Sequence, residues 1–425
     1  GTLVLNVTSN SGVTGADIVY ATTSNKLVPI RVSDLTRFFT ESYGSDELNY
    51  VVLRGVPSSG TLYYNYNGTE SYGSSKQVKI TASNYSSYKF YVDPTSTKDY
   101  LLSGLTYVPS GSNYCVTIPF TAYGDKTSRS AKGSILISVT NSTVSEVYSL
   151  TTINSQVNLD AAGIYNAVQS ATGQNLSYIQ FTDLPSSNRG TLYYTGTGSS
   201  TQRKVSTEDT FKYSGSGTNM SSLYFTPKGT GSINLPYVAF TSSGKAIAYG
   251  NVAIGVVSRI VSYNDVGASR WYYKYVVELS DAGVINGMPD GNYAGQRDVT
   301  YGEALKLIML AAGRCTEQTK QAGKHWAAGY MEIAQRLGIL AGDVDLDAPI
   351  SRQAVATLAA NAMRLSSYPG SSPFADTSNS SVLKLYEAGI VEGSEGANGA
   401  MYFYPNNTLT RAEVATIIWR IYNAS

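Results

Sequence analysis

Two stretches in the N-terminal half of the sequence share the same five residues. Residues 60–64 read Gly-Thr-Leu-Tyr-Tyr, and residues 190–194 read Gly-Thr-Leu-Tyr-Tyr again. Three further pairs of segments correspond: 48–51 with 176–179, 116–123 with 233–240, and 133–139 with 250–256. The offset between the copies is 128 and then 130 residues in the first two pairs and drifts to 117 in the last two, so the copies differ in the length of their loops. The first 258 residues therefore contain an internal repeat.

The local pattern within each copy predicts β-structure. Short runs of β-branched and aromatic residues alternate in polarity and are separated by Gly, Ser, Asn and Pro, which is typical of antiparallel sandwiches. We therefore expect two tandem all-β sandwiches, residues 1–141 and 142–258. Two helix-prone stretches, residues 32–39 and 159–165, interrupt the pattern, and we expect a turn or two of helix at each.

The composition excludes several classes of protein. Only 14% of the residues are charged, against roughly 25% in an average soluble domain, and the net charge is +1, so no basic field attracts nucleic acid. No apolar run is long enough to predict a membrane span. The two cysteines, Cys115 and Cys315, are expected to be spare buried thiols, and the lone His325 has no Cys or acidic partner arranged near it in sequence. We expect no cofactor and no metal.

The pattern changes after residue 258. Apolar residues now recur with the helical period, and the pattern appears three times, at about residues 260–313, 323–365 and 372–423. Each copy contains a helix, a Gly-rich stop, a polar loop and a second helix that begins at a capping residue. Thr300 with Glu303 and Thr410 with Glu413 fit the capping box, whereas Ser351 keeps only the cap. We expect residues 259–425 to form an all-α tandem repeat in which the copies share one core.

Particular residues in these copies resemble a known family. The hallmarks are an aromatic-x-Asp entry, a Trp, a Gly-Ile-x-x-Gly segment, an Asp-Gly loop and a Thr-Arg-Ala-Glu restart, which stands intact at residues 410–413. These features resemble the surface-layer homology (SLH) motifs of bacterial surface-layer proteins. The resemblance implies a pseudo-trimer of three motifs whose grooves bind anionic, often pyruvylated, secondary cell-wall polysaccharide. The N-terminal repeats resemble immunoglobulin- or cadherin-like modules of bacterial surface proteins, and that likeness implies no site residues.

The resemblance also implies candidate binding residues. The restart Arg of the family corresponds to Arg352 and Arg411, whereas Tyr301 takes this place in the first copy. A guanidinium at the start of a helix is in any case a suitable receptor for a carboxylate or phosphate. The indoles of Trp271 and Trp326 could stack on sugar rings, although core packing is the commoner role of Trp in small helical repeats. The predicted polymer site consists of Arg352, Arg411, Trp271, Trp326, Asp290 and Gly291.

Other constellations predict no chemistry. The run Asp343, Asp345 and Asp347 begins like a calcium loop, but Ala348 replaces the essential Gly and Ala354 the bidentate Glu, so we expect a solvated turn in which Asp345 matches Asp290. Asp265 and Asp376 are expected to cap or form turns. Neither a nucleophile elbow nor a phosphate-binding Gly loop is present in the sequence. Two carboxylates suffice for glycosidase chemistry, and nothing in the sequence points to such a pair.

Together these features predict a structural protein of the bacterial cell surface rather than an enzyme. We expect an extracellular protein held noncovalently on the wall polymer, with two sandwich modules that self-associate into a lattice or fibre because the surface is neutral and Tyr-rich. A wall-anchored adhesin or glycan-binding module is the alternative, followed by a fragment of an SLH-anchored enzyme.

Overall fold

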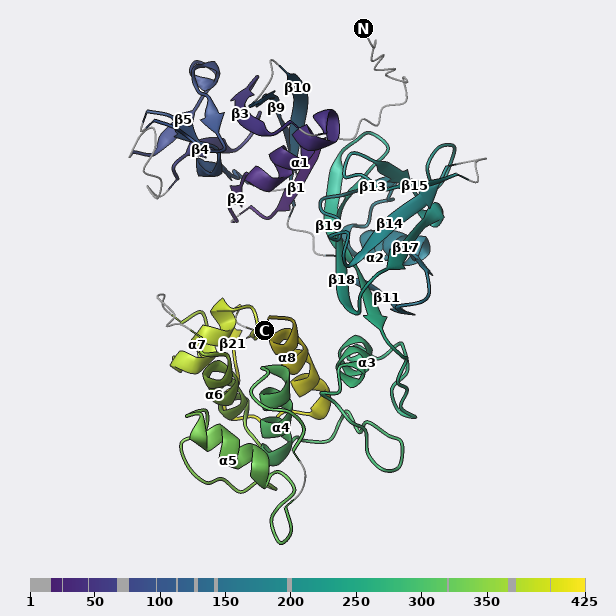
Figure 1. Cartoon of the computed structure of the whole chain (residues 1–425), viewed down its shortest axis with the longest axis vertical. Helices are drawn as coiled ribbons and strands as arrows, with labels where there is room; N and C mark the ends of the chain where they lie inside the picture. The colour runs from purple at the N-terminus through teal and green to yellow at the C-terminus, as the bar shows by residue number, and fades with distance from the viewer. Residues whose placement is uncertain are drawn as a thin grey trace. The chain divides into compact units, whose positions relative to one another are not determined.

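The chain folds into two compact units that divide after Val256. The structure is a computed structural model, and it describes residues 17–24, 26–44, 46–66, 76–96, 98–111, 114–125, 129–140, 144–196, 201–318, 321–365, 372–397 and 399–424. Figure 1 shows strands in the first unit and helices in the second. This division confirms the coarse prediction that a β-rich N-terminal region is followed by a helical one.

The first repeat consists of two sheets around one core. Its elements are β1 (Ile18–Thr22), β2 (Val28–Pro29), α1 (Val32–Tyr43), β3 (Leu48–Leu53), β4 (Thr61–Tyr64), β5 (Val78–Ile80), β6 (Phe90–Tyr91), β7 (Tyr100–Leu101), β8 (Leu105–Val108), β9 (Tyr114–Gly124) and β10 (Ser130–Val139). One sheet has the order β1-β10-β9-β3-β6-β7 and the other β2-β8-β4-β5. Alternate residues of β9, among them Ile118 and Phe120, are fully buried, as the two-residue period predicts.

The second repeat has the same arrangement. Its elements are β11 (Val147–Thr152), β12 (Val157–Asn158), α2 (Ala161–Thr172), β13 (Tyr178–Phe181), β14 (Gly190–Thr195), β15 (Gln202–Lys204), β16 (Thr210–Lys212), β17 (Leu223–Pro227), β18 (Gly231–Phe240) and β19 (Ala246–Val257). The sheet orders, β11-β19-β18-β13-β16 and β12-β17-β14-β15, follow those of the first repeat. Both Gly-Thr-Leu-Tyr-Tyr segments contribute a strand, β4 and β14, at equivalent places. The predicted boundary at residues 141 and 142 falls outside the described residues.

Two details of these repeats differ from the sequence prediction. The pairs β1–β10 and β6–β7 are parallel rather than antiparallel. Strands that are not joined by a hairpin can pair in either direction, and β1 is far from β10 in sequence. The helices α1 and α2 have 12 residues each instead of a turn or two. In α1 the buried residues Leu35, Phe38 and Phe39 have helical spacing, so tertiary packing extends the helix beyond its weak sequence signal.

A small apolar cluster joins the two repeats within this unit. Its buried members are Val19 of the first repeat and Tyr178, Val238, Phe240 and Ala246 of the second, and Ala21, Cys115 and Leu136 pack against them. The rings of Tyr178 and Phe240 stack with their centroids 4.7 Å apart. Burial raises the pKa of the Cys115 thiol from its ordinary 9.0 to about 11. Cys115 and Cys315 are both free thiols, as predicted, but each is only partly buried. Cys115 packs against this cluster and therefore reports on the contact.

We expect Cys115 to react slowly with iodoacetamide at pH 8. A pKa of about 11 instead of 9.0 reduces the reactive thiolate about 100-fold, before any steric protection. The substitution Leu136→Asp should open the contact and accelerate labelling, whereas Lys132→Asp, at an exposed position of the same strand, should not. Mass spectrometry of the labelled peptides measures both rates. Unchanged labelling of Cys115 in Leu136→Asp would contradict the contact.

The second unit consists of six helices and one short hairpin among its described residues. These elements are α3 (Tyr273–Asp281), α4 (Tyr301–Ala311), α5 (Ala328–Arg336), α6 (Arg352–Met363), α7 (Ser380–Glu387), the strands β20 (Ser394–Glu395) and β21 (Met401–Tyr402), and α8 (Arg411–Ala424). The helices α4, α6 and α8 begin directly after Thr300, Ser351 and Thr410, where the capping signals place them. The hairpin β20–β21 departs from a purely helical repeat. Among the described residues, no helix combines the length and hydropathy that a bilayer span requires.

Three buried residues lie at the centre of the helical unit. Val299, Ile350 and Leu409 each precede a helix cap, and each is 0% exposed. The Val299 N–H donates to the Leu409 carbonyl at 2.9 Å, and the Ile350 N–H donates to the Val299 carbonyl at 3.0 Å. Residues of all three copies belong to the single core of this unit. The second helix of each copy, α4, α6 or α8, therefore begins near one shared point; we call these three the restart helices. The prediction of a common core is confirmed.

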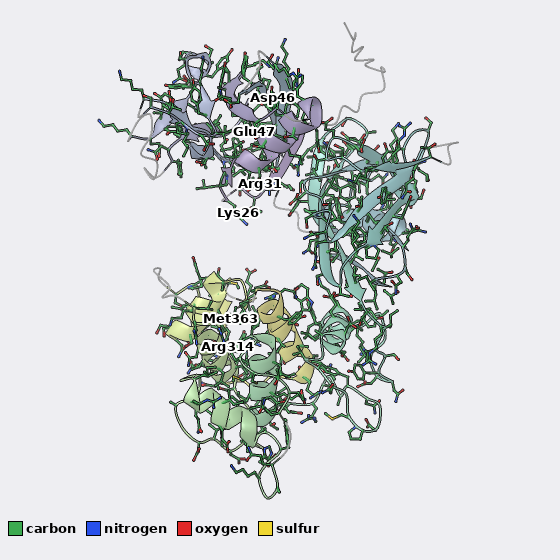
Figure 2. The ribbon with its side chains drawn as sticks, viewed as in Figure 1. Lys26, Arg31, Asp46, Glu47, Arg314 and Met363 are labelled. Atoms are coloured by element: carbon green, nitrogen blue, oxygen red, sulfur yellow. The ribbon has the colours of Figure 1, made fainter. Side chains whose placement is uncertain are left out.

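Side chains from different copies also join the helices to one another. Arg314, which follows α4, donates its Nε–H to the Ala362 carbonyl in α6 at 2.5 Å, and Figure 2 labels Arg314 together with the neighbouring Met363. Trp419 of α8 donates its Nε1–H to Glu278 Oε2 of α3 at 2.7 Å. These bonds connect the first copy to the second and the third.

Removal of one central side chain should destabilise the whole helical unit. Ile350→Ala leaves a cavity among fully buried neighbours, and we expect it to lower the free energy of unfolding by about 2–5 kcal/mol. All three Trp of the chain, Trp271, Trp326 and Trp419, lie in this unit, so Trp fluorescence during urea denaturation reports its unfolding selectively. Ile260→Ala is the control, because Ile260 is 56% exposed. Equal losses in both variants would argue against a shared core.

Candidate functional site

Two of the predicted site residues, both Trp, lie at the surface. Trp271 is 59% and Trp326 36% exposed, so core packing, which we considered the commoner role, is wrong for both. Each stands two residues before a helix, α3 or α5, and its indole is therefore outside the buried stripe of that helix. These indoles are accessible to a ligand.

Trp326 and Arg411 line one pocket, which we call groove 1. It has a volume of about 160 Å³ and is formed around the loop that follows α3. Its lining residues are Val284, Asn286, Gly287, Met288, Glu303, Lys306, Leu307, Trp326 and Arg411. The first copy thus supplies the loop and the glutamate, the second copy the Trp, and the third copy the Arg.

Trp271 and Arg352 line a second pocket, which we call groove 3. It has a volume of about 180 Å³ and is formed around the loop that follows α7. Its lining residues are Trp271, Arg352, Ile390, Val391, Glu392, Leu409, Glu413, Thr416, Ile417 and Arg420. Here the third copy supplies the loop and the glutamate, the first copy the Trp, and the second copy the Arg. Both grooves therefore combine the same residue types in the same roles.

Arg411 is held in a fixed orientation in groove 1. Its Cζ lies 4.7 Å from the centroid of the Tyr293 ring, and its Nε–H donates to the Tyr293 carbonyl at 2.9 Å. Its Nη1 donates to Glu303 Oε1 at 3.0 Å and its Nη2 to the Asn286 carbonyl at 3.2 Å. Only 9% of the Arg411 side chain is exposed. The guanidinium is thus preorganised, and its contacts also stabilise the helical unit.

Arg352 has an equivalent but more open position in groove 3. Its Cζ lies 5.1 Å from the centroid of the Phe403 ring, and its Nε–H donates to the Phe403 carbonyl at 2.8 Å. The distance from Nη1 to Glu413 Oε1 is 3.8 Å, and 21% of the side chain is exposed. Burial lowers the pKa of Arg352, which the nearby Glu413 and Asp376 partly offset. A ligand anion could therefore reach this guanidinium more readily than that of Arg411.

The capping glutamates have a second role that the sequence analysis missed. Glu303 Oε2 accepts from the Thr300 N–H at 3.1 Å, and Thr300 Oγ1 accepts from the Glu303 N–H at 3.3 Å, which forms the predicted capping box. Thr410 and Glu413 make the same two bonds, at 2.8 and 3.3 Å. In each glutamate the other oxygen, Oε1, faces the Arg of the groove. One carboxylate therefore both starts the helix and orients the guanidinium.

The cap at the second copy is simpler. Ser351 Oγ accepts from the Ala354 N–H at 3.2 Å, as predicted for a cap without the glutamate. Because Ala354 has no carboxylate, this helix start offers no oxygen to orient a guanidinium. At the two positions equivalent to the groove Arg and Trp, the first copy carries Tyr301 and the third copy carries Ser378, two residues before α7.

Further polar residues line the two grooves without having been predicted. Lys306 in groove 1 and Thr416 in groove 3 both stand three residues after the capping glutamate, and Arg420 stands seven residues after it. This spacing places them on the same helix face as the glutamate, and it is the signal that could have identified them. Lys306 Nζ lies 2.6 Å from Glu317 Oε1, and Arg420 Nη2 lies 2.8 Å from Glu392 Oε1.

Asp290 and Gly291 lie in an exposed turn and line neither groove. Asp290 Oδ1 accepts from the Asn292 N–H at 2.9 Å, and this bond holds the pKa of Asp290 below its usual range. Asp345 makes the same kind of bond to the Asp347 N–H at 3.0 Å, as its predicted correspondence with Asp290 requires. The structure therefore does not bring Asp290 and Gly291 together with the other predicted site residues.

Asp265 and Asp376 act on the loops, as predicted. Asp265 accepts from the N–H groups of Tyr293 and Ala294 at 2.7 and 2.8 Å. Asp376 accepts from the N–H groups of Phe403 and Tyr404 at 2.9 and 2.7 Å. Each aspartate thus fixes the aromatic residue on which the groove Arg stacks.

His325 has an acidic partner that is distant in sequence. Its Nε2 lies 3.1 Å from Asp347 Oδ1, and its Nδ1 accepts from the Ala327 N–H at 3.1 Å. Asp347 is 81% exposed in its side chain, and the pair is separated by 22 residues, which is why the local sequence did not reveal it. These contacts tie together the segment before α5 and the loop that precedes α6.

Comparison with known proteins agrees with this geometry. Residues 262–305 and 373–415 match the S-layer homology domain. These two stretches lie in the first and third copies, which supply the loops of grooves 1 and 3. The helical unit is thus defined as one that carries S-layer homology domains.

Individual relatives point to the same class. The chain is 29% identical over 106 residues to the Surface-layer 125 kDa protein of Lysinibacillus sphaericus, covering 22% of this chain and 9% of that protein. It is 27% identical to S-layer protein EA1 of Bacillus anthracis, covering 25% and 14%, and 28% identical to Exoglucanase XynX of Acetivibrio thermocellus, covering 40% and 17%. The chain thus spans less than a fifth of each relative. The protein is thus placed at the bacterial cell surface, and its helical unit carries S-layer homology domains.

The two groove arginines should differ in their effect on stability. Arg411→Ala removes a buried guanidinium and its hydrogen bonds, while Arg297 stays paired with Glu303, and we expect it to lower the free energy of unfolding of the helical unit by about 1–3 kcal/mol. Arg352→Ala breaks a longer and more exposed pair and should cost about 1 kcal/mol or less. Urea denaturation followed by Trp fluorescence measures both, with the exposed Arg270→Ala as control. Similar losses for both variants would show that the pairs are equivalent.

Proposed function

We propose that the helical unit binds an anionic secondary cell-wall polysaccharide in grooves 1 and 3 and thereby attaches the chain noncovalently to the wall. The observation that supports this most directly is the repetition of one constellation. Each groove offers an exposed indole, a preorganised guanidinium and a carboxylate, drawn from three different copies. Residues that serve only the core would have no reason to recur in this way at the surface.

The chemistry of the grooves suits an acidic sugar. An indole provides a flat apolar face for the C–H side of a sugar ring. The guanidinium fork donates to a carboxylate, such as a pyruvyl substituent, or to a phosphate. The glutamate accepts from sugar hydroxyls, and Lys306 and Arg420 add positive charge. Because the whole chain has a net charge of only +1, these local charges rather than a general field would select the anion.

We further propose that the three copies form a pseudo-threefold arrangement. Three isolated β-bridges support this, because each joins a different pair of copies. They are Asp298 with Thr410, Thr300 with Pro349, and Ser351 with Thr408. In such an arrangement the groove at the second copy would contain Tyr301, Ser378 and Ala354, and it would not bind the anion. Two sites would therefore act on one polymer and gain avidity from their linkage.

For the two β repeats we propose a structural role, as immunoglobulin- or cadherin-like modules spanning residues 1–141 and 142–258. They would be presented outward from the wall and would associate with other copies in a lattice or fibre. The low charge and the 35 Tyr of the chain support association, because little repulsion opposes contact and Tyr is favoured in interfaces.

A sedimentation assay with purified wall sacculi tests the attachment. The chain should co-sediment with intact sacculi and should no longer do so after acid extraction of the secondary polymer. Trp271→Ala and Trp326→Ala should each weaken binding about ten-fold, which corresponds to about 1.4 kcal/mol. Both indoles are exposed, so these variants should remain folded.

A control and a third groove variant make the assay specific. Tyr422→Ala removes another exposed aromatic side chain of the same unit, outside both grooves, and should bind like the parent. Arg352→Ala should weaken binding by about 1.5–3 kcal/mol through the loss of charge-assisted hydrogen bonds. Binding that survives extraction of the polymer, or that is insensitive to both Trp variants, would refute the proposed sites.

A further inference from the structure

The contact between the two β repeats is asymmetric. The first repeat contributes an aliphatic face, Val19, Ala21 and Leu136, and the second contributes an aromatic face centred on Tyr178 and Phe240. Tyr178 and Phe240 are directly opposite each other on β13 and β18, and their rings stack at 4.7 Å and 6°. They are only 3% and 2% exposed, so the stacked pair is covered.

The first repeat carries its own copy of this aromatic face. In the internal repeat, Tyr50 corresponds to Tyr178 and Tyr123 to Phe240. Tyr50 and Tyr123 are directly opposite each other on β3 and β9, and their rings stack at 4.7 Å and 14°. The same stacked ring pair therefore occurs in both repeats. The first repeat covers the pair Tyr178–Phe240 of the second repeat.

The surroundings of Tyr50 show a face that is accessible. Tyr50 and Tyr123 are both partly exposed, and the ring of Tyr91 lies 5.3 Å from that of Tyr50. The exposed Lys89 places its Nζ 4.9 Å from the Tyr50 centroid. Thr121 replaces Val238, so this face is more polar than its covered equivalent. A more polar face suits a contact that forms and dissociates rather than a permanent one.

The second repeat likewise carries the counterpart of the aliphatic face. β11 holds the same place in its sheet as β1, and Thr22 and Thr151 make equivalent bonds, from Oγ1 to the carbonyls of Lys26 and Ser155 at 2.7 and 3.1 Å. This register matches Tyr148 with Val19 and Leu150 with Ala21. The internal repeat matches Ala253 with Leu136. Tyr148 and Leu150 are larger than their counterparts Val19 and Ala21, whereas Ala253 is smaller than Leu136, so the face remains apolar and gains one aromatic ring.

We infer that the Tyr50–Tyr123 face of one chain is an interface that receives the Tyr148–Leu150 face of a second copy of this chain. Among its described residues the chain has two aromatic faces and two counterpart faces, and one of each is used in its internal contact. The remaining two are complementary in the same sense, so the contact between copies repeats the contact within each copy. Such a head-to-tail contact is heterologous and propagates into an open filament unless it closes into a ring.

This inference rests on the proposed self-association of the β repeats and is independent of wall binding. Sedimentation velocity of the full chain over a range of concentrations tests it. We expect the parent chain to form oligomers, and Tyr50→Asp and Leu150→Asp each to weaken self-association at least ten-fold. The control Tyr193→Asp alters another stacked pair, Tyr193 with Tyr224 at 5.8 Å on the other sheet of the second repeat, and should associate like the parent.

Mixing the two variants tests the polarity of the contact. The Tyr50→Asp chain retains an intact Tyr148–Leu150 face, and the Leu150→Asp chain retains an intact Tyr50–Tyr123 face. An equimolar mixture should therefore form one-to-one dimers that grow no further. Circular dichroism and slow labelling of Cys115 verify that both variants keep the fold and the internal contact.

The outcomes separate this inference from the rest of the proposed function. A parent chain that remains monomeric at every concentration overturns both self-association and the inferred interface. Oligomers that resist both substitutions leave self-association intact and overturn the interface. A mixture that forms no dimers overturns the head-to-tail polarity. Attachment to sacculi should be the same for the parent and for Tyr50→Asp, so failure of the wall assay would concern the helical unit alone.

Discussion

The helical unit depends on the meeting of Val299, Ile350 and Leu409. Each of these buried residues directly precedes the cap of a restart helix, so fixing the three together fixes where three helices begin. The groove arginine and the capping glutamate stand in the first turn of these helices. Their positions are therefore set by the core rather than by flexible loops, which is the condition for a preorganised binding site.

Neither groove belongs to a single copy. The second copy has Ala354 in place of the capping Glu, yet it supplies Trp326 to groove 1 and Arg352 to groove 3. The missing carboxylate of Ala354 affects the groove at the second copy's own loop and neither of the other two grooves. The residues that it contributes to its neighbours retain the chemistry of the site, which explains how a divergent copy remains necessary.

The sequence predicted the features that depend on local patterns. The internal repeat, the helix starts at Thr300, Ser351 and Thr410, and the shared helical core all follow from periodicity and capping chemistry. The features that it missed depend on distant partners. The exposure of Trp271 and Trp326, the parallel pairing of β1 with β10, and the contact of His325 with Asp347 are decided by segments far along the chain. The sequence also missed that each groove is built from residues of three copies, because no spacing within one copy reveals it.

The sharing of each groove among copies has a mechanical consequence. A polymer strand bound in groove 3, as proposed, would contact Trp271 near the start of the unit and Arg420 near its end, together with Arg352 between them in sequence. A pulling force on that strand is transmitted to α3, α6 and α8 at once. These helices belong to one core, so the force must shear the entire core instead of peeling one helix at a time. Attachment built in this way resists load until the whole unit yields.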